Sequence, residues 1–108
     1  MKEYEIIHYT ENGKDIFNEW YRSLRDLRGR AAIDRVLGRV GLGNFGTHHY
    51  CRDGVWEFII DYGAGYRIYY SLSGMKIVLL LCAGTKRTQD RDIDQAVEYL
   101  KRYKEATK

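Results

Sequence analysis

The spacing of apolar residues changes along the chain between two residues, typical of strands, and about 3.6 residues, typical of helices. Residues 4–9 (YEIIHY) predict a short first strand, which Asn12-Gly13 ends. From about Lys14 to Val40, apolar residues recur at helical spacing with an interruption at Gly29. This segment therefore predicts two successive helices.

Glycines at 41, 43 and 46 are expected to end the second helix and to open a polar loop that runs through Gly54. Three strands are predicted after it, at 55–61, 66–72 and 76–83, joined by glycine-containing hairpin turns. The third of them (KIVLLLCA) is apolar on both faces, which indicates a central strand covered on each side.

A polar segment, 84–89, leads to a last helix with Asp90 and Asp92 in its first turn and lysine and arginine in its last turn. The predicted order is β-α-α-β-β-β-α. We expect one α+β domain over residues 1–108, with helices against one face of a mostly antiparallel sheet.

The composition narrows the class of protein. Among the 108 residues, the longest apolar run is 77–83, which is too short to span a membrane. The two cysteines, Cys51 and Cys82, have no metal-binding spacing. We therefore expect a cytoplasmic protein with reduced thiols, no metal, no cofactor and no membrane partner.

Positive charge is concentrated in the middle of the chain. Residues 22–87 contain eleven basic and five acidic residues, a net charge of +6, whereas the whole chain has +3. Arg28, Arg35 and Arg39 fall near one face of the second predicted helix. A polyanion, an acidic partner chain or solvent could each face them.

Arg67 lies in the middle of a predicted strand, on the face opposite to the apolar row Tyr66, Ile68 and Tyr70. An arginine there needs an anionic partner or an open groove. From the residues alone, an ion pair with Glu57 or Asp61 of the neighbouring strand is favoured.

Two further polar segments are candidates for chemistry. Lys86 and Arg87 lie between a strand and a helix start, where backbone N–H groups suit a phosphate. His48 and His49, followed by Arg52, are expected in the glycine-rich loop, where a histidine could transfer protons. Tyrosines near the last hairpin could stack a base, although most are expected in the core; these are Tyr62, Tyr66, Tyr69 and Tyr70.

Three long segments together resemble the RelE/ParE toxin superfamily, and within it the HigB-like branch of phage-related addiction-module killer proteins. They are WYRSLRDLRGRAAIDRVLGRVGLGNFG (20–46), GVWEFIIDYGAGYRIYY (54–70) and IVLLLCAGTKRTQDRDIDQA (77–96). The resemblance covers nearly the whole chain. It implies an antiparallel sheet backed by an N-terminal helical hairpin, in agreement with the order predicted from periodicity.

The resemblance also implies a function. Members of this family are toxins of type II toxin–antitoxin pairs, neutralised by a cognate antitoxin that is commonly a HigA-like helix-turn-helix protein in this branch. Many are ribosome-dependent endoribonucleases that cleave mRNA without a metal, giving a 2′,3′-cyclic phosphate and a 5′-OH. ParE-type relatives instead poison DNA gyrase by binding, and this is the alternative function.

By matching positions, the resemblance implies that Arg67 contacts the scissile phosphate and that Lys86 and Arg87 form the basic loop before the last helix. The sequence departs from the nuclease pattern at Ile59, where close relatives have a basic residue, and at Ile93, where some have a tyrosine. The general acid or base is thus open among four residues: His48, His49, Glu57 and Asp61. Arg28, Arg35, Arg39, Arg52 and Tyr69 are the candidates for contacting RNA or the ribosome.

Overall fold

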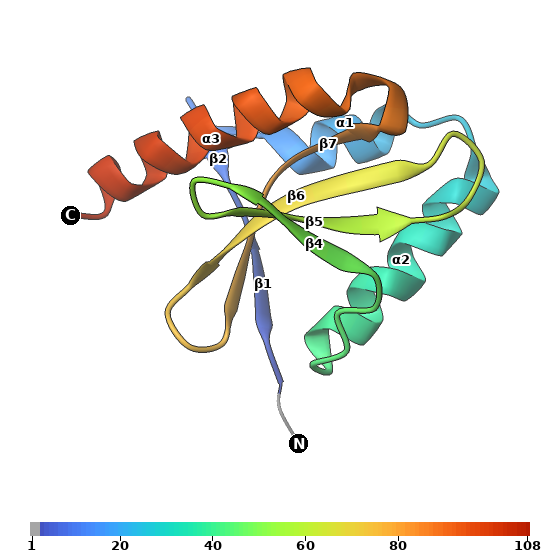
Figure 1. Ribbon diagram of the computed structural model, residues 1–108, viewed down its shortest axis with the longest axis horizontal. Coiled ribbons are helices and arrows are strands. Elements are labelled where there is room, and N and C mark those ends of the chain that lie inside the picture. Colours follow the sequence, from blue (N-terminus) through green and yellow to red (C-terminus); the bar gives the residue numbers. More distant parts are fainter. Residues whose placement is uncertain (1–2) are drawn as a thin grey trace.

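The computed structural model describes residues 3–108, and its centre is a five-stranded sheet (Figure 1). The strand order is β1-β7-β6-β5-β4, with β1 parallel to β7 and every other pair antiparallel. The strands are β1 (Glu5–His8), β4 (His48–Arg52), β5 (Val55–Ile60), β6 (Tyr66–Ser73) and β7 (Ile77–Thr85). A mostly antiparallel sheet in an α+β domain is confirmed.

Three helices pack on this sheet, as the apolar spacing predicted. They are α1 (Ile16–Ser23), α2 (Leu27–Gly41) and α3 (Gln89–Ala106), and a short 3₁₀ turn, η1 (Lys86–Thr88), precedes α3. Asp15 caps α1 by accepting from the Asn18 N–H, and Asp26 caps α2 by accepting from the Gly29 N–H. These aspartates satisfy backbone donors that the first helical turn leaves free. The predicted interruption at Gly29 is wrong, because α1 ends at Ser23 and Gly29 lies inside α2, where its N–H donates to the cap residue Asp26.

The helices cover both faces of the sheet. Phe17 of α1 and Ile33 of α2 pack on one face with Phe58 and Tyr70. Helix α3 covers the other face, where its Ala96, Val97 and Leu100 pack against Val55, Tyr69, Leu79 and Leu81. The expectation that all helices lie on one face is therefore wrong, because β5 and β6 also carry apolar residues on their second face and α3 buries them.

Strand β7 has apolar residues on both faces, which is why helices cover both faces of the sheet. Its Val78 and Leu80 point to α1 and α2, whereas Leu79 and Leu81 point to α3. The prediction of a strand covered on each side is confirmed. In the sheet order β7 is an inner strand, and β6 occupies the middle position.

Two further elements differ from the sequence prediction. The segment predicted as a polar loop contains β4, whose residues are mostly exposed because it is an edge strand, so it lacks the apolar alternation that marks a half-buried strand. The second is a small hairpin, β2 (Thr10–Glu11) and β3 (Lys14–Asp15), so α1 begins at Ile16 rather than Lys14. Asn12 and Gly13 form its turn with φ of 53° and 79°, which a two-residue hairpin turn requires.

Within residues 3–108, no helix has the length and apolar character that crossing a membrane requires.

Candidate active site

The α3-facing side of β4, β5 and β6 carries a group of polar residues at the end of the sheet where α3 begins. Glu57 lies opposite Tyr69 and opposite His49, and Ile59 lies opposite Arg67. Directly opposed residues of an antiparallel pair point to the same face. Three of the predicted site residues, Glu57, Arg67 and His49, therefore share one face.

Glu57 is the buried acid of this group, with 5% of its surface exposed. The side chain of Gln89, in the first turn of α3, donates from Nε2 to both carboxylate oxygens at 2.9 and 3.2 Å. Arg67 Nε lies 3.6 Å from Glu57 Oε1. The ion pair favoured from the residues alone is thus present, with Glu57 rather than Asp61 as the acid. We call Glu57, Arg67 and Gln89 the carboxylate cluster.

Arg67 retains unused hydrogen-bonding capacity. Its side chain is 11% exposed, and its buried Nε has no hydrogen-bond partner among the described residues. The distance to Glu57 is long for a charge-assisted bond, which is usually below about 2.9 Å. The buried hydroxyl of Tyr69 also lacks a partner within residues 3–108. A buried donor without a partner costs stability. The Arg67 guanidinium can therefore gain by donating to a further anionic ligand.

The start of α3 is held close to the sheet. Gly84, opposite Arg67, has no side chain, and a Cβ there would clash with the Asp92 carboxylate. The Lys86 N–H donates to the Gly65 carbonyl at 2.8 Å, which connects η1 to the turn between β5 and β6. These contacts place Gln89 over Glu57.

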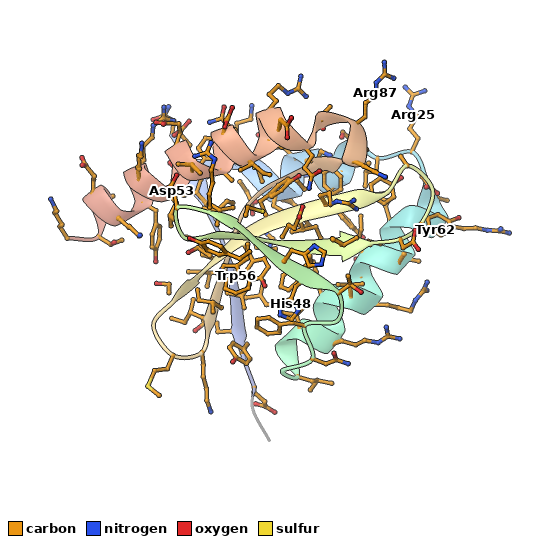
Figure 2. The ribbon with its side chains drawn as sticks, viewed as in Figure 1. Arg25, His48, Asp53, Trp56, Tyr62 and Arg87 are labelled. Atoms are coloured by element: carbon orange, nitrogen blue, oxygen red, sulfur yellow. The ribbon has the colours of Figure 1, made fainter. Side chains whose placement is uncertain are left out.

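Lys86 and Arg87 are exposed on η1 and make no ion pair within residues 3–108. In Figure 2, Arg87 projects outward from the turn before α3, and Arg25 of the α1–α2 connection also points to solvent. An open hollow of about 400 Å³ lies at the start of α3 and is lined by Lys86, Arg87, Thr88, Gln89, Asp90 and Arg91. Gln89 belongs both to this hollow and to the carboxylate cluster, so the two are adjacent.

The structure separates the remaining acid–base candidates. His48 lies opposite Phe58 and packs between Phe45 and Trp56, so it faces the α2 side of the sheet, away from Arg67 (Figure 2). His49 is exposed on the face of Glu57. Asp61 is exposed just beyond the end of β5 and makes no ion pair with Arg67.

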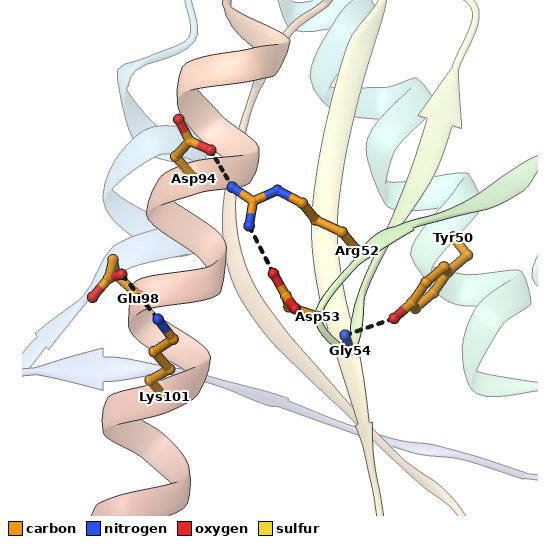
Figure 3. Close-up of polar contacts among 7 residues, drawn as sticks. All are labelled: Tyr50, Arg52, Asp53, Gly54, Asp94, Glu98 and Lys101. Carbon is orange, nitrogen blue, oxygen red and sulfur yellow. Dashed lines mark hydrogen bonds and ion pairs between the residues drawn. The ribbon is translucent and has the colours of Figure 1, made fainter.

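Two of the residues suggested for RNA contact have other roles in the fold. Tyr69 is fully buried under α3, which removes its ring as a surface for stacking a base. Arg52 pairs with Asp53 at 2.8 Å and with Asp94 of α3, and so fastens the β4–β5 turn to the helix (Figure 3). Nearby, the Gly54 N–H donates to the Tyr50 hydroxyl at 3.0 Å.

Arg28, Arg35 and Arg39 are exposed on α2 and make no ion pair with a described residue. They belong to the layer opposite α3. The structure therefore does not bring them into the carboxylate cluster, and they form a separate basic surface.

Burial and charge together change the acid–base chemistry around the cluster. Burial raises the pKa of the Tyr69 hydroxyl far above its usual value, and the Glu57 and Asp92 charges add to this effect. The pKa of the Cys51 thiol is raised to about 11, first by burial and then by the Glu57 charge. Burial raises the pKa of Cys82 to about 12. The side chains of Tyr69 and Cys51, whose pKa values respond to the Glu57 charge, are therefore neutral at neutral pH.

Gln89 is the residue that the sequence reasoning missed. It directly follows Lys86, Arg87 and Thr88. This position next to the basic pair was the only sequence feature that could have indicated a role in the site. Its partner Glu57 is 32 residues away, so no local pattern connects them.

The two departures from the nuclease pattern also have structural positions. Ile59 lies directly opposite Arg67, and Ile93 packs against the α3 core as expected. Among residues 3–108 there is no group of three or more histidine, cysteine, aspartate or glutamate side chains that could hold a metal ion.

Comparison with known proteins identifies a relative of the chain. No protein-family model matches the chain. An uncharacterized protein of Haemophilus influenzae is 44% identical to it over 80 residues, which cover 74% of this chain and 81% of that protein. Identity at this level over most of both sequences shows common ancestry, so the chain belongs to the same protein family as this Haemophilus influenzae protein.

Proposed function

We propose that the protein is a toxin of the RelE/ParE type, with a RelE/ParE-like fold, that cleaves mRNA on the ribosome without a metal. The observation that carries this proposal is the carboxylate cluster beside a hollow lined by cations. A buried acid that is hydrogen-bonded to a residue lining an open basic hollow suits proton transfer next to a bound phosphate. The resemblance of residues 20–46, 54–70 and 77–96 to that family supports the same conclusion.

The reaction is an attack of a ribose 2′-OH on the adjacent phosphorus. Glu57 accepts the 2′-OH proton as the new P–O bond forms, the P–O5′ bond breaks, and a proton passes to the leaving 5′ oxygen. The products are a 2′,3′-cyclic phosphate and a 5′-OH. Glu57 suits the role of base because it lies next to Arg67. His48 faces the other side of the sheet, and Asp61 lies beyond the end of strand β5. His49, exposed on the same face, is the candidate for the acid.

The cations have a separate task in this proposal. Negative charge builds on the phosphate oxygens in the transition state, and cations held in place stabilise it. Arg67 is the inner cation, since its guanidinium has no ion-pair partner besides Glu57 among residues 3–108. Lys86 and Arg87 are the outer cations at the hollow. We further propose that the protein acts in the cytoplasm and is neutralised by a helix-turn-helix antitoxin.

Transcript mapping tests the proposal. Expression of the protein in bacteria should produce new mRNA 5′ ends in translated regions, linked to the reading frame. Arg67→Ala and Glu57→Gln should each strongly reduce these ends, leaving only a residual cleavage rate, and relieve growth arrest while near-ultraviolet circular dichroism stays native. Growth arrest with unchanged transcripts would contradict the proposal.

A second candidate function, binding of DNA gyrase as in ParE-type toxins, is favoured by the apolar residues at two positions of the site. The strand position opposite Arg67 is the apolar Ile59, and α3 presents Ile93 to the core rather than a tyrosine to the site. A ParE-like protein that binds DNA gyrase needs no catalytic residues there. Supercoiling by purified gyrase separates the two, because the binding toxin inhibits it and the nuclease leaves it unchanged.

A further inference from the structure

We infer that Gln89 is a positioning residue for the Glu57 carboxylate, and this rests on the proposed function. Gln89 is the only described residue that donates a hydrogen bond to the Glu57 carboxylate, and it does so from the first turn of α3 rather than from the sheet. Both carboxylate oxygens accept from one amide nitrogen, at 2.9 and 3.2 Å. The shortest distance between Arg67 and the carboxylate joins Nε to Oε1 and is 3.6 Å.

The geometry explains why Arg67 alone does not orient the carboxylate. An arginine that orients a carboxylate strongly does so with two parallel N–H bonds. Here the shortest nitrogen–oxygen distance between Arg67 and Glu57 is 3.6 Å, and the Arg67 Nε makes no hydrogen bond within residues 3–108. When a substrate phosphate draws the guanidinium toward itself, the Gln89 amide is the remaining described group that holds Glu57. A base must stay within hydrogen-bond reach of the proton that it removes.

Helix α3 in turn holds Gln89. The Thr88 hydroxyl donates to Asp92 Oδ2 at 2.5 Å, and the Thr85 N–H donates to the Thr88 hydroxyl at 3.4 Å. Gly84 allows this first turn to approach β7 closely. The segment at the start of α3 therefore has two roles. Lys86 and Arg87 of η1 present positive charge to the substrate, and Gln89 of α3 orients the Glu57 carboxylate.

The test is a double-mutant cycle with programmed ribosomes. Gln89→Met keeps the length of the side chain and removes its donor. At saturating protein, we expect it to lower the single-turnover cleavage rate of a short ribosome-bound mRNA about tenfold to a hundredfold. The concentration giving half the maximal rate should stay unchanged, because Gln89 carries no charge. Gln95→Met, on an exposed position of the same helix, is the matched control and should behave as wild type.

The decisive arm is the Glu57→Gln background. If Gln89 acts through Glu57, then adding Gln89→Met to Glu57→Gln should cause no further loss of rate. Equal losses in both backgrounds, or a wild-type rate for Gln89→Met alone, would overturn the inference and leave the proposed function standing.

Side-chain amide NMR spectra distinguish failure of the Gln89 inference from failure of the proposed function. In ¹⁵N-labelled protein, the Gln89 Nε2 signals should move on Glu57→Gln, while those of Gln95 should not. A wild-type protein that cleaves no mRNA would overturn both the proposed function and the catalytic part of this inference. Unmoved Gln89 signals in an active protein would overturn the inference alone.

Discussion

Asp26 shows how one side chain can connect two parts of the fold. Its Oδ1 accepts from the Gly29 N–H at 2.9 Å and caps α2, while its Oδ2 accepts from the Tyr66 hydroxyl of β6 at 2.8 Å. These bonds, the backbone one first, hold the pKa of Asp26 below its usual value. The cap is a local bond that spans three residues, whereas the bond to Tyr66 spans 40 residues and requires the packed sheet.

The Asp26 bonds predict an acid-dependent stability. Because the folded pKa is depressed, the stabilisation is complete above the unfolded value of about 3.9 and is lost as pH falls through the folded pKa. Asp26→Asn should lower the melting temperature at pH 7 and make the difference from wild type shrink below pH 4. Thermal unfolding followed by circular dichroism at pH 2.5–7 measures this. A difference between the two proteins that is constant over this range would contradict it.

The thiols give a second prediction at this scale. With pKa values of about 11 for Cys51 and about 12 for Cys82, little thiolate exists at pH 8. Alkylation by iodoacetamide should be slower than for a free cysteine by about a hundredfold or more, since the thiolate reacts. Glu57→Gln in a Cys82→Ser background should speed alkylation of Cys51, because a repelling charge is removed. Mass spectrometry over time measures both, with urea-unfolded protein as the fully reactive control.

Helix α3 is the element on which the candidate site depends. Its first turn packs against β7 at Gly84, and its later turns cover the second face of the sheet. The apolar spacing of Ile93, Ala96, Val97 and Leu100 predicts the helix and its buried side. That spacing does not say which face of the sheet is covered, because both faces of β7 are apolar. The tertiary packing decides it and so places Gln89 at Glu57.

Two glycine substitutions test the packing of this element. Gly84→Ala places a Cβ against Asp92 and Thr88 and should destabilise the protein by about 1–3 kcal/mol through overpacking. It should also weaken the Gln89–Glu57 bond and thus slow cleavage on the proposed function. Gly38→Ala, in α2 with no atom near the added Cβ, should instead stabilise by about 1 kcal/mol. Urea unfolding measures both, and equal effects of the two would contradict a close approach at Gly84.

At the scale of the whole molecule, the basic groups lie on two surfaces. Lys86 and Arg87 flank the carboxylate cluster at the start of α3, and Arg28, Arg35 and Arg39 lie on α2 in the opposite layer. Five of the eleven basic residues in 22–87 are therefore divided between two places. On the proposed function, one surface serves the scissile phosphate and the other serves the surrounding RNA.

This division predicts separable effects. Arg28, Arg35 and Arg39 changed together to glutamine should weaken binding to single-stranded RNA and flatten its salt dependence. Each lost phosphate contact lowers the slope of log affinity against log salt by about 0.7. The cleavage rate at saturating protein should remain that of wild type. Filter binding at several salt concentrations, with Lys101→Gln as a control, measures this, and an unchanged slope would remove α2 from the RNA surface.

Local pattern was sufficient for much of this protein and insufficient for its chemistry. Three helices follow from apolar spacing, because a half-buried helix repeats its burial along the chain. Strand β7 follows from its unbroken apolar run, and the turns follow from the glycines. Edge strand β4 has no such repeat, since it is largely exposed, and it was predicted as a loop. Arg67 and Glu57 could be proposed as partners because neighbouring strands place them on one face.

The sequence by itself determined the helices, the main strands, the basic middle segment and the candidates Arg67, Lys86 and Arg87. Only the tertiary structure decided that α3 covers the second face, that Tyr69 is buried, that His48 points away and that Gln89 holds Glu57. The physical reason is range. Periodicity reports which side of an element is buried, whereas a site is formed by contacts between elements, and these depend on which faces pack together.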